Sequence, residues 1–162
     1  MSRLWKSIGA GALGGLFASY AMNKYSDAIS ATSRAITGQP SLNQDEDATV
    51  KTAQAISRLA FHHELTDSEK RWAAPAVHYS MGVGFGAVYG FLAEKVPATA
   101  AGLGLPYGTA VWIGADEVAV PAMGFAKGPA ETSLSAHLNA LASHLVYGVV
   151  TAATRKLMLR AD

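Results

Sequence analysis

The stretch "VHYSMGVGFGAVYGFLAEK", residues 77–95, combines one histidine, His78, with a glycine at every fourth position, Gly82, Gly86 and Gly90. A glycine in an exposed helix interior costs about 1 kcal/mol relative to alanine. In lipid, the same four-residue spacing lets two helices approach each other backbone to backbone. The stretch therefore indicates a membrane helix that packs through its glycines, and its histidine needs a separate explanation.

The composition favours a membrane protein over an ordinary soluble domain. The chain has 162 residues, which suits a single domain over 1–162, and 50% of them are hydrophobic while 15% are charged. Soluble domains carry about 25% charged residues. The mean hydropathy of +0.17 is low for a multispanning protein, because alanine and glycine rather than leucine and isoleucine fill the apolar stretches.

Charge and cysteine usage exclude several classes of site. The chain has no cysteine, so disulfides, thiolate metal ligands and cysteine nucleophiles are excluded. The net charge is +1 and no long basic cluster occurs, which argues against a nucleic-acid partner. We expect the lipid bilayer as the main partner instead.

The spacing of charged residues predicts the architecture. Four stretches with few or no charges are long enough, or nearly so, for a bilayer core of about 30 Å. They cover residues 7–25, 72–93, 101–125 and 132–154, and no alternating β pattern occurs. The polar segment 26–71 has apolar residues at helical intervals, which predicts an amphipathic helix. The fold class we predict is all-α: a four-helix transmembrane bundle with an extra amphipathic helix in its first loop.

Four spans place both termini on one side of the membrane. Basic residues gather next to both ends, at Arg3, Lys6, Arg155, Lys156 and Arg160. Short membrane-flanking segments rich in lysine and arginine stay in the cytoplasm. We therefore expect cytoplasmic termini.

The four-residue spacing of small residues recurs in the other spans. The second span has the pattern His78-xxx-Gly82-xxx-Gly86, and the fourth has the similar pattern His144-xxx-Gly148-xxx-Ala152. This similarity is consistent with a duplicated helix pair or with the abundance of small residues alone. The glycines predicted to pack helices, within the chain or against another copy or a larger complex, are Gly82, Gly86, Gly90, Gly104, Gly108 and Gly148.

Ionisable residues inside the spans form the candidate site. Each costs about 2.5–3.5 kcal/mol on insertion, so such side chains face the protein interior and pair with one another. We expect a histidine of the second span to pair with a carboxylate of the third, and a histidine of the fourth to lie opposite. The predicted buried polar cluster consists of His78, Asp116, Glu117, His137 and His144.

Three interpretations of this cluster stay open. Its members form interhelical hydrogen bonds worth about 1 kcal/mol each, or relay protons along a solute path, or bind a transition metal through His78, Glu117 and His137. His137 and His144 lie two turns apart, about 10.5 Å along one helix, which is too far for one ion. Haem held by two histidines is a further possibility for the cofactor.

Motifs for known chemistries are missing. The sequence contains no P-loop, dinucleotide-binding fingerprint, H-E-x-x-H or G-x-S-x-G motif, so we assign no catalytic residue and favour a non-enzymatic role. His62 and His63 form a separate pair, which we interpret as solvated loop residues.

From His78 onward the chain resembles the YagU-like bacterial inner-membrane proteins. The similarity is carried by "HYSMGVGFGAVYGFLAE", "GLGLPYGTAVW", "VPAMG" and the acidic residue and histidine of "ETSLSAHL", over about half of the chain. It implies a multi-pass protein of the bacterial inner membrane and suggests a role in envelope or acid-stress physiology. It transfers no catalytic residue.

Three functions follow from these observations. The first is a packing or accessory membrane protein that assembles with itself or a larger complex through glycine-lined faces. The second is a small transporter or a proton- or metal-handling membrane protein that uses the ionisable cluster. The third is a soluble helical bundle rich in alanine and glycine, which the modest mean hydropathy leaves open.

Overall fold

The computed structural model describes residues 2–38 and 44–160, and within these ranges the chain is helical with no β-strand. This confirms the all-α class. Residues 39–43 of the predicted polar segment 26–71 lie outside the described residues. The helices are α1 (Arg3–Thr37), α2 (Gln44–Phe61), α3 (Asp67–Lys95), α4 (Leu105–Trp112), α5 (Val120–Ala122) and α6 (Leu134–Met158), with a π-helix η2 (Ile113–Ala119) and two 3₁₀ segments, η1 (Pro97–Gly104) and η3 (Pro129–Glu131).

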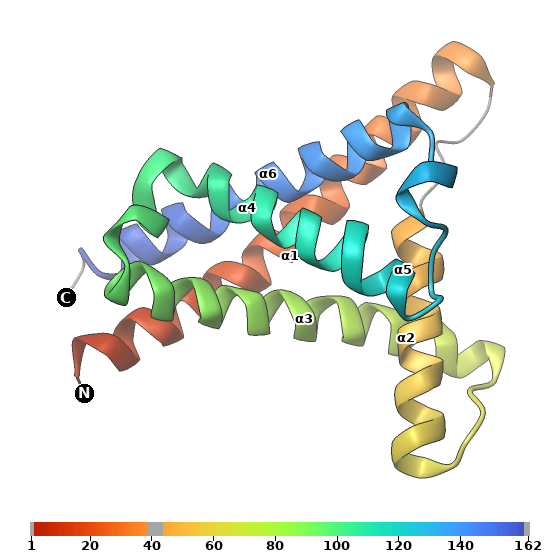
Figure 1. Ribbon diagram of the computed structural model, residues 1–162, viewed down its shortest axis with the longest axis horizontal. Helices are drawn as coiled ribbons and strands as arrows, with labels where there is room; N and C mark the ends of the chain where they lie inside the picture. Colours follow the sequence, from red (N-terminus) through yellow and green to blue (C-terminus); the bar gives the residue numbers. More distant parts are fainter. Residues whose placement is uncertain (1, 39–43, 161–162) are drawn as a thin grey trace.

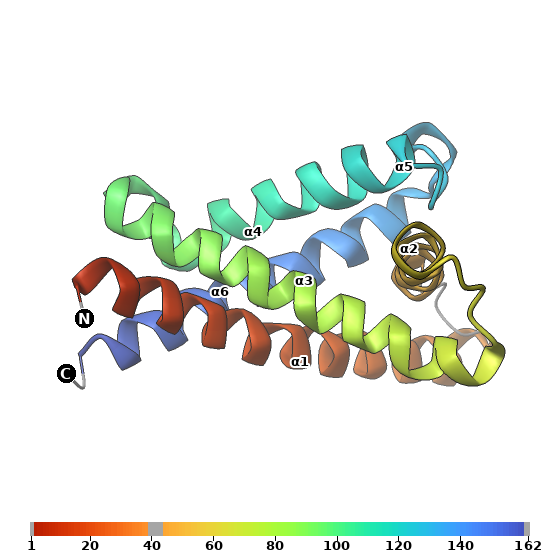
Figure 2. The same cartoon turned by 90° about the horizontal axis from the view of Figure 1, so that it is seen from below.

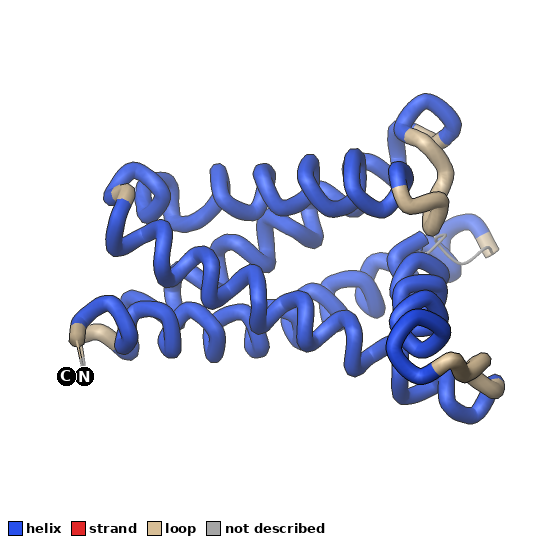
Figure 3. The backbone as a smooth tube through the Cα atoms, turned by 60° about the horizontal axis from the view of Figure 1, so that its bottom comes forward, coloured by secondary structure: helices blue, strands red, loops and turns tan. Residues whose placement is uncertain are grey.

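Four helical rods form a bundle, and a fifth helix crosses one of its ends. α1 packs against α3 and α6, and α6 packs against α4. α4, η2 and α5 follow one another as a single rod (Figure 1). α2 lies across the bundle at the end far from both termini (Figure 2). Short loops join most of the rods (Figure 3).

Local signals explain several helix boundaries. At the start of α3, the Thr66 hydroxyl accepts a hydrogen bond from the Glu69 backbone N–H, and the Glu69 carboxylate accepts one from the Thr66 backbone N–H. This reciprocal capping box satisfies two backbone donors that the first turn leaves open. α6 is capped by Ser133, and α1 ends at Gly38 in a left-handed conformation. α3 continues without interruption through Pro75.

The glycines of residues 77–95 pack α3 onto α1. A Cβ atom added at Gly86 would collide with the carbonyl oxygen of Gly11, and one added at Gly82 would collide with Ser19. A Cβ at Gly15 would collide with the carbonyl oxygen of Gly82. The two backbones therefore approach closely, as small residues at this spacing permit.

The same arrangement recurs between α4 and α6. Cβ atoms at Gly104 and Gly108 would collide with the carbonyl oxygens of Gly148 and His144, respectively. A Cβ at Gly14 would lie 2.8 Å from the carbonyl oxygen of Thr151, where α1 meets α6. The predicted packing glycines thus lie against neighbouring helices of the same chain.

Small residues, together with Met22, Val111 and three tyrosines, fill the core of the bundle, while many large aliphatic and aromatic residues are exposed. No leucine, isoleucine, phenylalanine or tryptophan in the described ranges is buried. Ala18, Ser7, Ser19, Ser143 and Thr151 are at most 1% exposed. In a water-soluble domain the large aliphatic and aromatic residues are the ones that are buried.

Tyrosine and serine hydroxyls link the rods through backbone carbonyls of α3. Tyr147 of α6 donates a hydrogen bond of 2.6 Å to the Gly82 carbonyl oxygen, and Tyr107 of α4 donates one of 2.6 Å to that of Phe85. Ser7 of α1 donates to the Gly90 carbonyl oxygen at 2.6 Å. Each of these three hydroxyls is therefore satisfied across a helix interface.

The helices differ in detail from the predicted ranges. α1 extends well beyond residues 7–25, and the third predicted span, 101–125, consists of a 3₁₀ segment, α4, the π-helix and α5. α2 occurs in the polar segment, where an amphipathic helix is predicted; its Ile56 and Leu59 are exposed, while Ala53 and Ser57 are buried. Within the described chain, no helix combines the length and the apolar character that crossing a bilayer requires.

Candidate functional site

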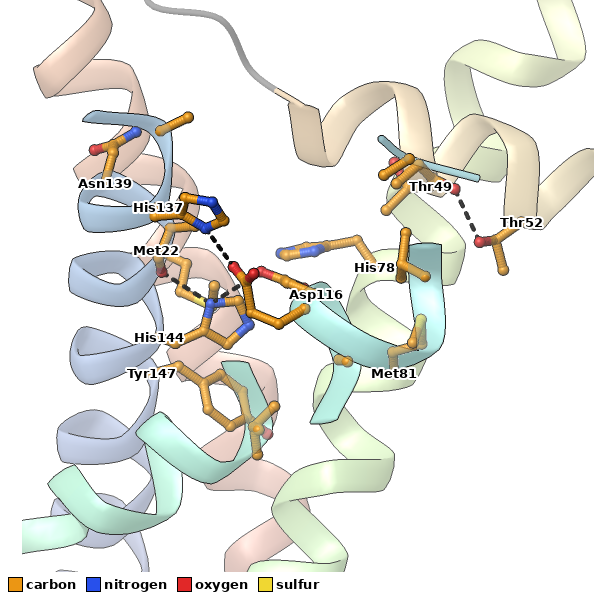
Figure 4. Close-up of a pocket in the computed structure, with 18 of the residues that line it drawn as sticks. Met22, Thr49, Thr52, His78, Met81, Asp116, His137, Asn139, His144 and Tyr147 are labelled. Atoms are coloured by element: carbon orange, nitrogen blue, oxygen red, sulfur yellow. Dashed lines mark hydrogen bonds and ion pairs between the residues drawn. The ribbon is translucent and has the colours of Figure 1, made fainter. Parts of the chain in front are cut away.

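All five residues of the predicted polar cluster line one cavity near the end of the bundle that α2 covers. The cavity has a volume of about 170 Å³. Figure 4 shows the side chains of His78, Asp116, His137 and His144 pointing toward a common space. We call this cavity, with His78, Asp116, Glu117, His137 and His144 on its wall, the ionisable pocket.

The two carboxylates come from the π-helix. Asp116 and Glu117 lie in the middle of Ile113–Ala119, where the i→i+5 hydrogen bonds widen the helix. Such segments are rare and occur frequently at functional sites. Both neighbouring residues line the pocket, and each pairs with a different histidine of α6.

His137 lies between two hydrogen-bond acceptors. Its Nδ1 is 2.7 Å from Glu117 Oε1, and its Nε2 is 3.0 Å from the carbonyl oxygen of Pro129. A carbonyl oxygen only accepts, so Nε2 carries a proton and donates it. A second proton must lie between Nδ1 and Glu117, because two lone pairs at this distance would repel each other. The Glu117 and His137 side chains therefore share one proton, and the pair has no net charge.

The histidine of the second pair lies two turns farther along α6. His144 Nδ1 donates to the Ala140 carbonyl oxygen at 3.0 Å and is 3.5 Å from Asp116 Oδ2. His144 is buried, with 8% of its surface exposed. His78 of α3 lines the same cavity from the opposite side (Figure 4).

Most of the remaining wall is apolar. Met22, Met81, Phe85, Val111 and Met123 lie on it. Methionine side chains are flexible and polarisable, so they adapt to ligands of different shape. The pocket therefore combines an ionisable side with a large, adaptable apolar side.

α2 closes part of the pocket with hydroxyl-bearing residues. Thr49 and Thr52 contribute to the wall, and Lys51 Nζ donates to the Phe125 carbonyl oxygen at 3.0 Å, which ties α2 to the loop after α5. Lys127 of that loop also lines the pocket. These residues were not among the predicted site residues, because the sequence of α2 predicts a surface helix. Nothing in that sequence indicates that the helix crosses the end of the bundle.

The opposite end of the bundle is held by a network of ionic hydrogen bonds. Arg155 of α6 donates to Ser7 Oγ at 2.8 Å and to Glu94 Oε2 at 3.0 Å. Arg3 pairs with Glu94 Oε1 at 3.0 Å. The Arg155 and Glu94 side chains are 12% and 18% exposed, so this network fastens three helices in a largely buried position.

The predicted pairing within the cluster is only partly right. We expected His78 to pair with Asp116 or Glu117, but the ion pairs run from these carboxylates to His144 and His137. The metal hypothesis for His78, Glu117 and His137 finds no support in the geometry. No group of three or more histidine, aspartate or glutamate residues in the described ranges is arranged to hold a metal ion.

His62 and His63 lie outside the pocket, in the exposed link between α2 and α3. His63 Nε2 lies 3.1 Å from the Glu69 carboxylate. The hydrogen bonds from the Thr66 backbone and side chain, with that of His63, lower the pKa of Glu69 to about 2. This cluster therefore belongs to the start of α3 rather than to the candidate site.

Comparison with known proteins identifies a family. Residues 42–153 match a family described as a protein of unknown function, DUF1440. No curated protein and no solved structure matches the chain. The resemblance to YagU-like proteins stays a prediction. Since the match spans more than half of the sequence, including α3, the π-helix and most of α6, the chain belongs to the DUF1440 family.

Proposed function

We propose that this chain is a membrane-embedded helical bundle that binds a small solute in the ionisable pocket. The observation that carries the proposal is the convergence of five ionisable side chains from three rods on one cavity, inside a bundle whose outside is apolar. Buried ionisable groups are expensive in a purely structural role, so they indicate function. The pocket thus favours solute handling over a role in packing alone.

The distribution of large apolar residues supports the membrane environment. Leu13 and Phe17 of α1, Val88 of α3, Ile113 of η2 and Val149 of α6 are exposed. Large apolar residues that gather on an outer surface mark membrane or protein interaction sites. We infer that lipid covers them.

The modest hydropathy of the helices has a physical reason in this proposal. The hydropathy of a helix averages all of its faces, although only the outer face meets lipid. On α6, His137 and His144 line the pocket while Leu138 and Val149 are exposed. α3 likewise combines a pocket-facing His78 with an exposed Val88. Polar residues on the inner faces therefore lower the average without contacting lipid.

The charge distribution supports an orientation with the termini in the cytoplasm. Both termini lie at the end of the bundle far from α2 (Figure 1). In the segments 2–10, 90–104 and 150–160, Glu94 is the one acidic residue. Lysine and arginine near membrane crossings stay on the cytoplasmic side. The basic residues of these segments are Arg3, Lys6, Lys95, Arg155, Lys156 and Arg160.

Filling the pocket tests the proposal. Ala140 lines the pocket, whereas Ala153 lies on the same helix and is exposed away from it. Purified wild-type protein, Ala140→Phe and the control Ala153→Phe are melted in detergent with benzylamine, benzyl alcohol or benzoate. At least one probe should raise the melting temperature of the wild type and of Ala153→Phe, and not that of Ala140→Phe. Equal responses of all three proteins to every probe would overturn the proposal.

A further inference from the structure

The charged groups of the ionisable pocket point to a class of ligand. Two carboxylates, Asp116 and Glu117, and one ammonium group, Lys127, lie on its wall. With the proton shared by Glu117 and His137 in place these groups sum to zero, and after that proton has left they sum to −1. The negative excess lies on the η2 side, where the pairs with His137 and His144 are located. A cation is therefore favoured over an anion.

We propose that the pocket binds a small organic cation with an apolar body, and that the cation replaces the proton shared by Glu117 and His137. This inference rests on the proposed solute-binding function and names its ligand class and its coupling to protons. The protonated amine would lie against Glu117 Oε1 and His137 Nδ1, which are 2.7 Å apart before binding. Its body would contact the methionines and Phe85 on the apolar wall.

The exchange conserves charge. Before binding, the pair contains carboxylate and imidazolium, or their tautomer with the same number of protons. An ammonium group brings +1 into the pocket and donates one N–H to Glu117 and another to Nδ1 of His137. His137 releases its Nδ1 proton to solvent and keeps Nε2–H on the Pro129 carbonyl oxygen. One cation enters, one proton leaves, and the net charge of the pocket is unchanged.

The surroundings of the pair favour this exchange over simple addition of a cation. Adding a positive charge to a partly buried site without removing another is costly. The Glu117 and His137 side chains are 17% and 20% exposed. Besides Glu117 and His137, the titratable and charged groups on the pocket wall are His78 of α3, Asp116 of η2, His144 and Tyr147 of α6 and Lys127 of the loop after α5. Lys127 adds to the positive charge, which favours loss of the proton when a cation arrives.

The size of the cavity limits the ligand. An apolar cavity of about 150 Å³ holds benzene, and the pocket has about 170 Å³. Benzylamine, which is protonated at neutral pH, is a suitable probe. Benzyl alcohol and benzoate have the same ring and carry no charge and a negative charge, respectively.

Calorimetry on the full chain in detergent tests the inference. Titrations of benzylamine in two buffers with different ionisation enthalpies count the protons released on binding. We expect about one proton per amine, and affinity for benzylamine about tenfold or more above that for benzyl alcohol, which is the range for a hydrogen-bonded ion pair. Binding of benzylamine without proton release would overturn the exchange. Equal binding of benzyl alcohol or benzoate would overturn the ligand class and leave the proposed solute-binding function standing.

Two variants separate the roles of the pair. Glu117→Gln keeps the shape of the side chain and should lose benzylamine binding at least about tenfold. His137→Gln keeps the carboxylate, so it should still bind benzylamine but release no proton. If His137→Gln still releases a proton on binding benzylamine, His137 is not the source of the released proton and the inference fails. This readout does not depend on the folding of Glu117→Gln. If no probe binds to the wild type, the proposed function and this inference fail together.

Discussion

At the scale of single residues, the five residues predicted to form one cluster line the same cavity, but their pairing could not be predicted. His78, Asp116, Glu117, His137 and His144 are rare ionisable groups in apolar helices, and this signal is local. Which carboxylate meets which histidine depends on the rotation of η2, which the π-helical hydrogen bonds set. No residue pattern in the sequence predicted those bonds, so the pairing could not be predicted.

The network at the end with the termini makes a residue-scale prediction. Arg155→Met removes the donor to Glu94 and Ser7 and should lower the free energy of unfolding by about 2 kcal/mol, since a largely buried charged hydrogen bond is lost. Lys156→Met is the matched control, because Lys156 is exposed on the same turn. Denaturation of the purified proteins measures both changes. If the two variants unfold alike, the network does not stabilise the helix ends.

Glu69 makes a prediction about pH. The pKa of the Glu69 carboxyl is lowered from 4.5 to about 2 in the folded protein. Its contribution to stability is therefore complete above pH 4.5 and is lost as the pH falls toward 2. Glu69→Gln should therefore be less stable than the wild type at pH 7, and the difference should shrink progressively below about pH 4.5. Melting curves at several pH values check this, and a constant difference down to pH 2.5 would contradict it.

At the scale of helices, the positions of the rods follow from the sequence, and their irregularities do not. Small residues four apart predicted close helix packing, and the glycines of α3 and α6 lie against backbone of α1 and α4. The crossing of α2 over the bundle end was not predictable. Its inner face consists of alanine and serine rather than large apolar residues, so its hydrophobic pattern indicates the wrong face.

Two glycines of α3 make a matched prediction. Gly86→Ala places a Cβ against the backbone of Gly11 and Gly15 and should cost about 1–3 kcal/mol, as overpacking does. Gly84 has nothing within 4 Å of an added Cβ, so Gly84→Ala should be neutral or stabilising by up to about 1 kcal/mol. Thermal unfolding in detergent compares the two variants. Equal melting temperatures would show that the glycine contacts do not set the packing of α1 on α3.

At the scale of the whole molecule, the account depends on the environment of the outer surface. Many large aliphatic side chains are exposed, and no leucine or isoleucine of the described residues is buried, which differs from the leucine- and isoleucine-rich core expected in water. In the proposed function, the pocket with its shared proton is the polar interior of a bundle whose outer surface contacts lipid. Composition favours a membrane environment, whereas the mean hydropathy does not separate the environments, because it combines the inner and outer faces of each helix.

The most direct measurement is the solvent exposure of the outer surface in reconstituted vesicles. The chain has no cysteine, so single cysteines can carry a spin label without a background. Labels at Val88 and Val149, which are exposed on α3 and α6, are compared with a label at Glu64 in the exposed link between α2 and α3. The account predicts that molecular oxygen reaches Val88 and Val149 readily while a water-soluble nickel chelate does not, with the opposite result at Glu64. Nickel access at Val88 and Val149 equal to that at Glu64 would contradict it.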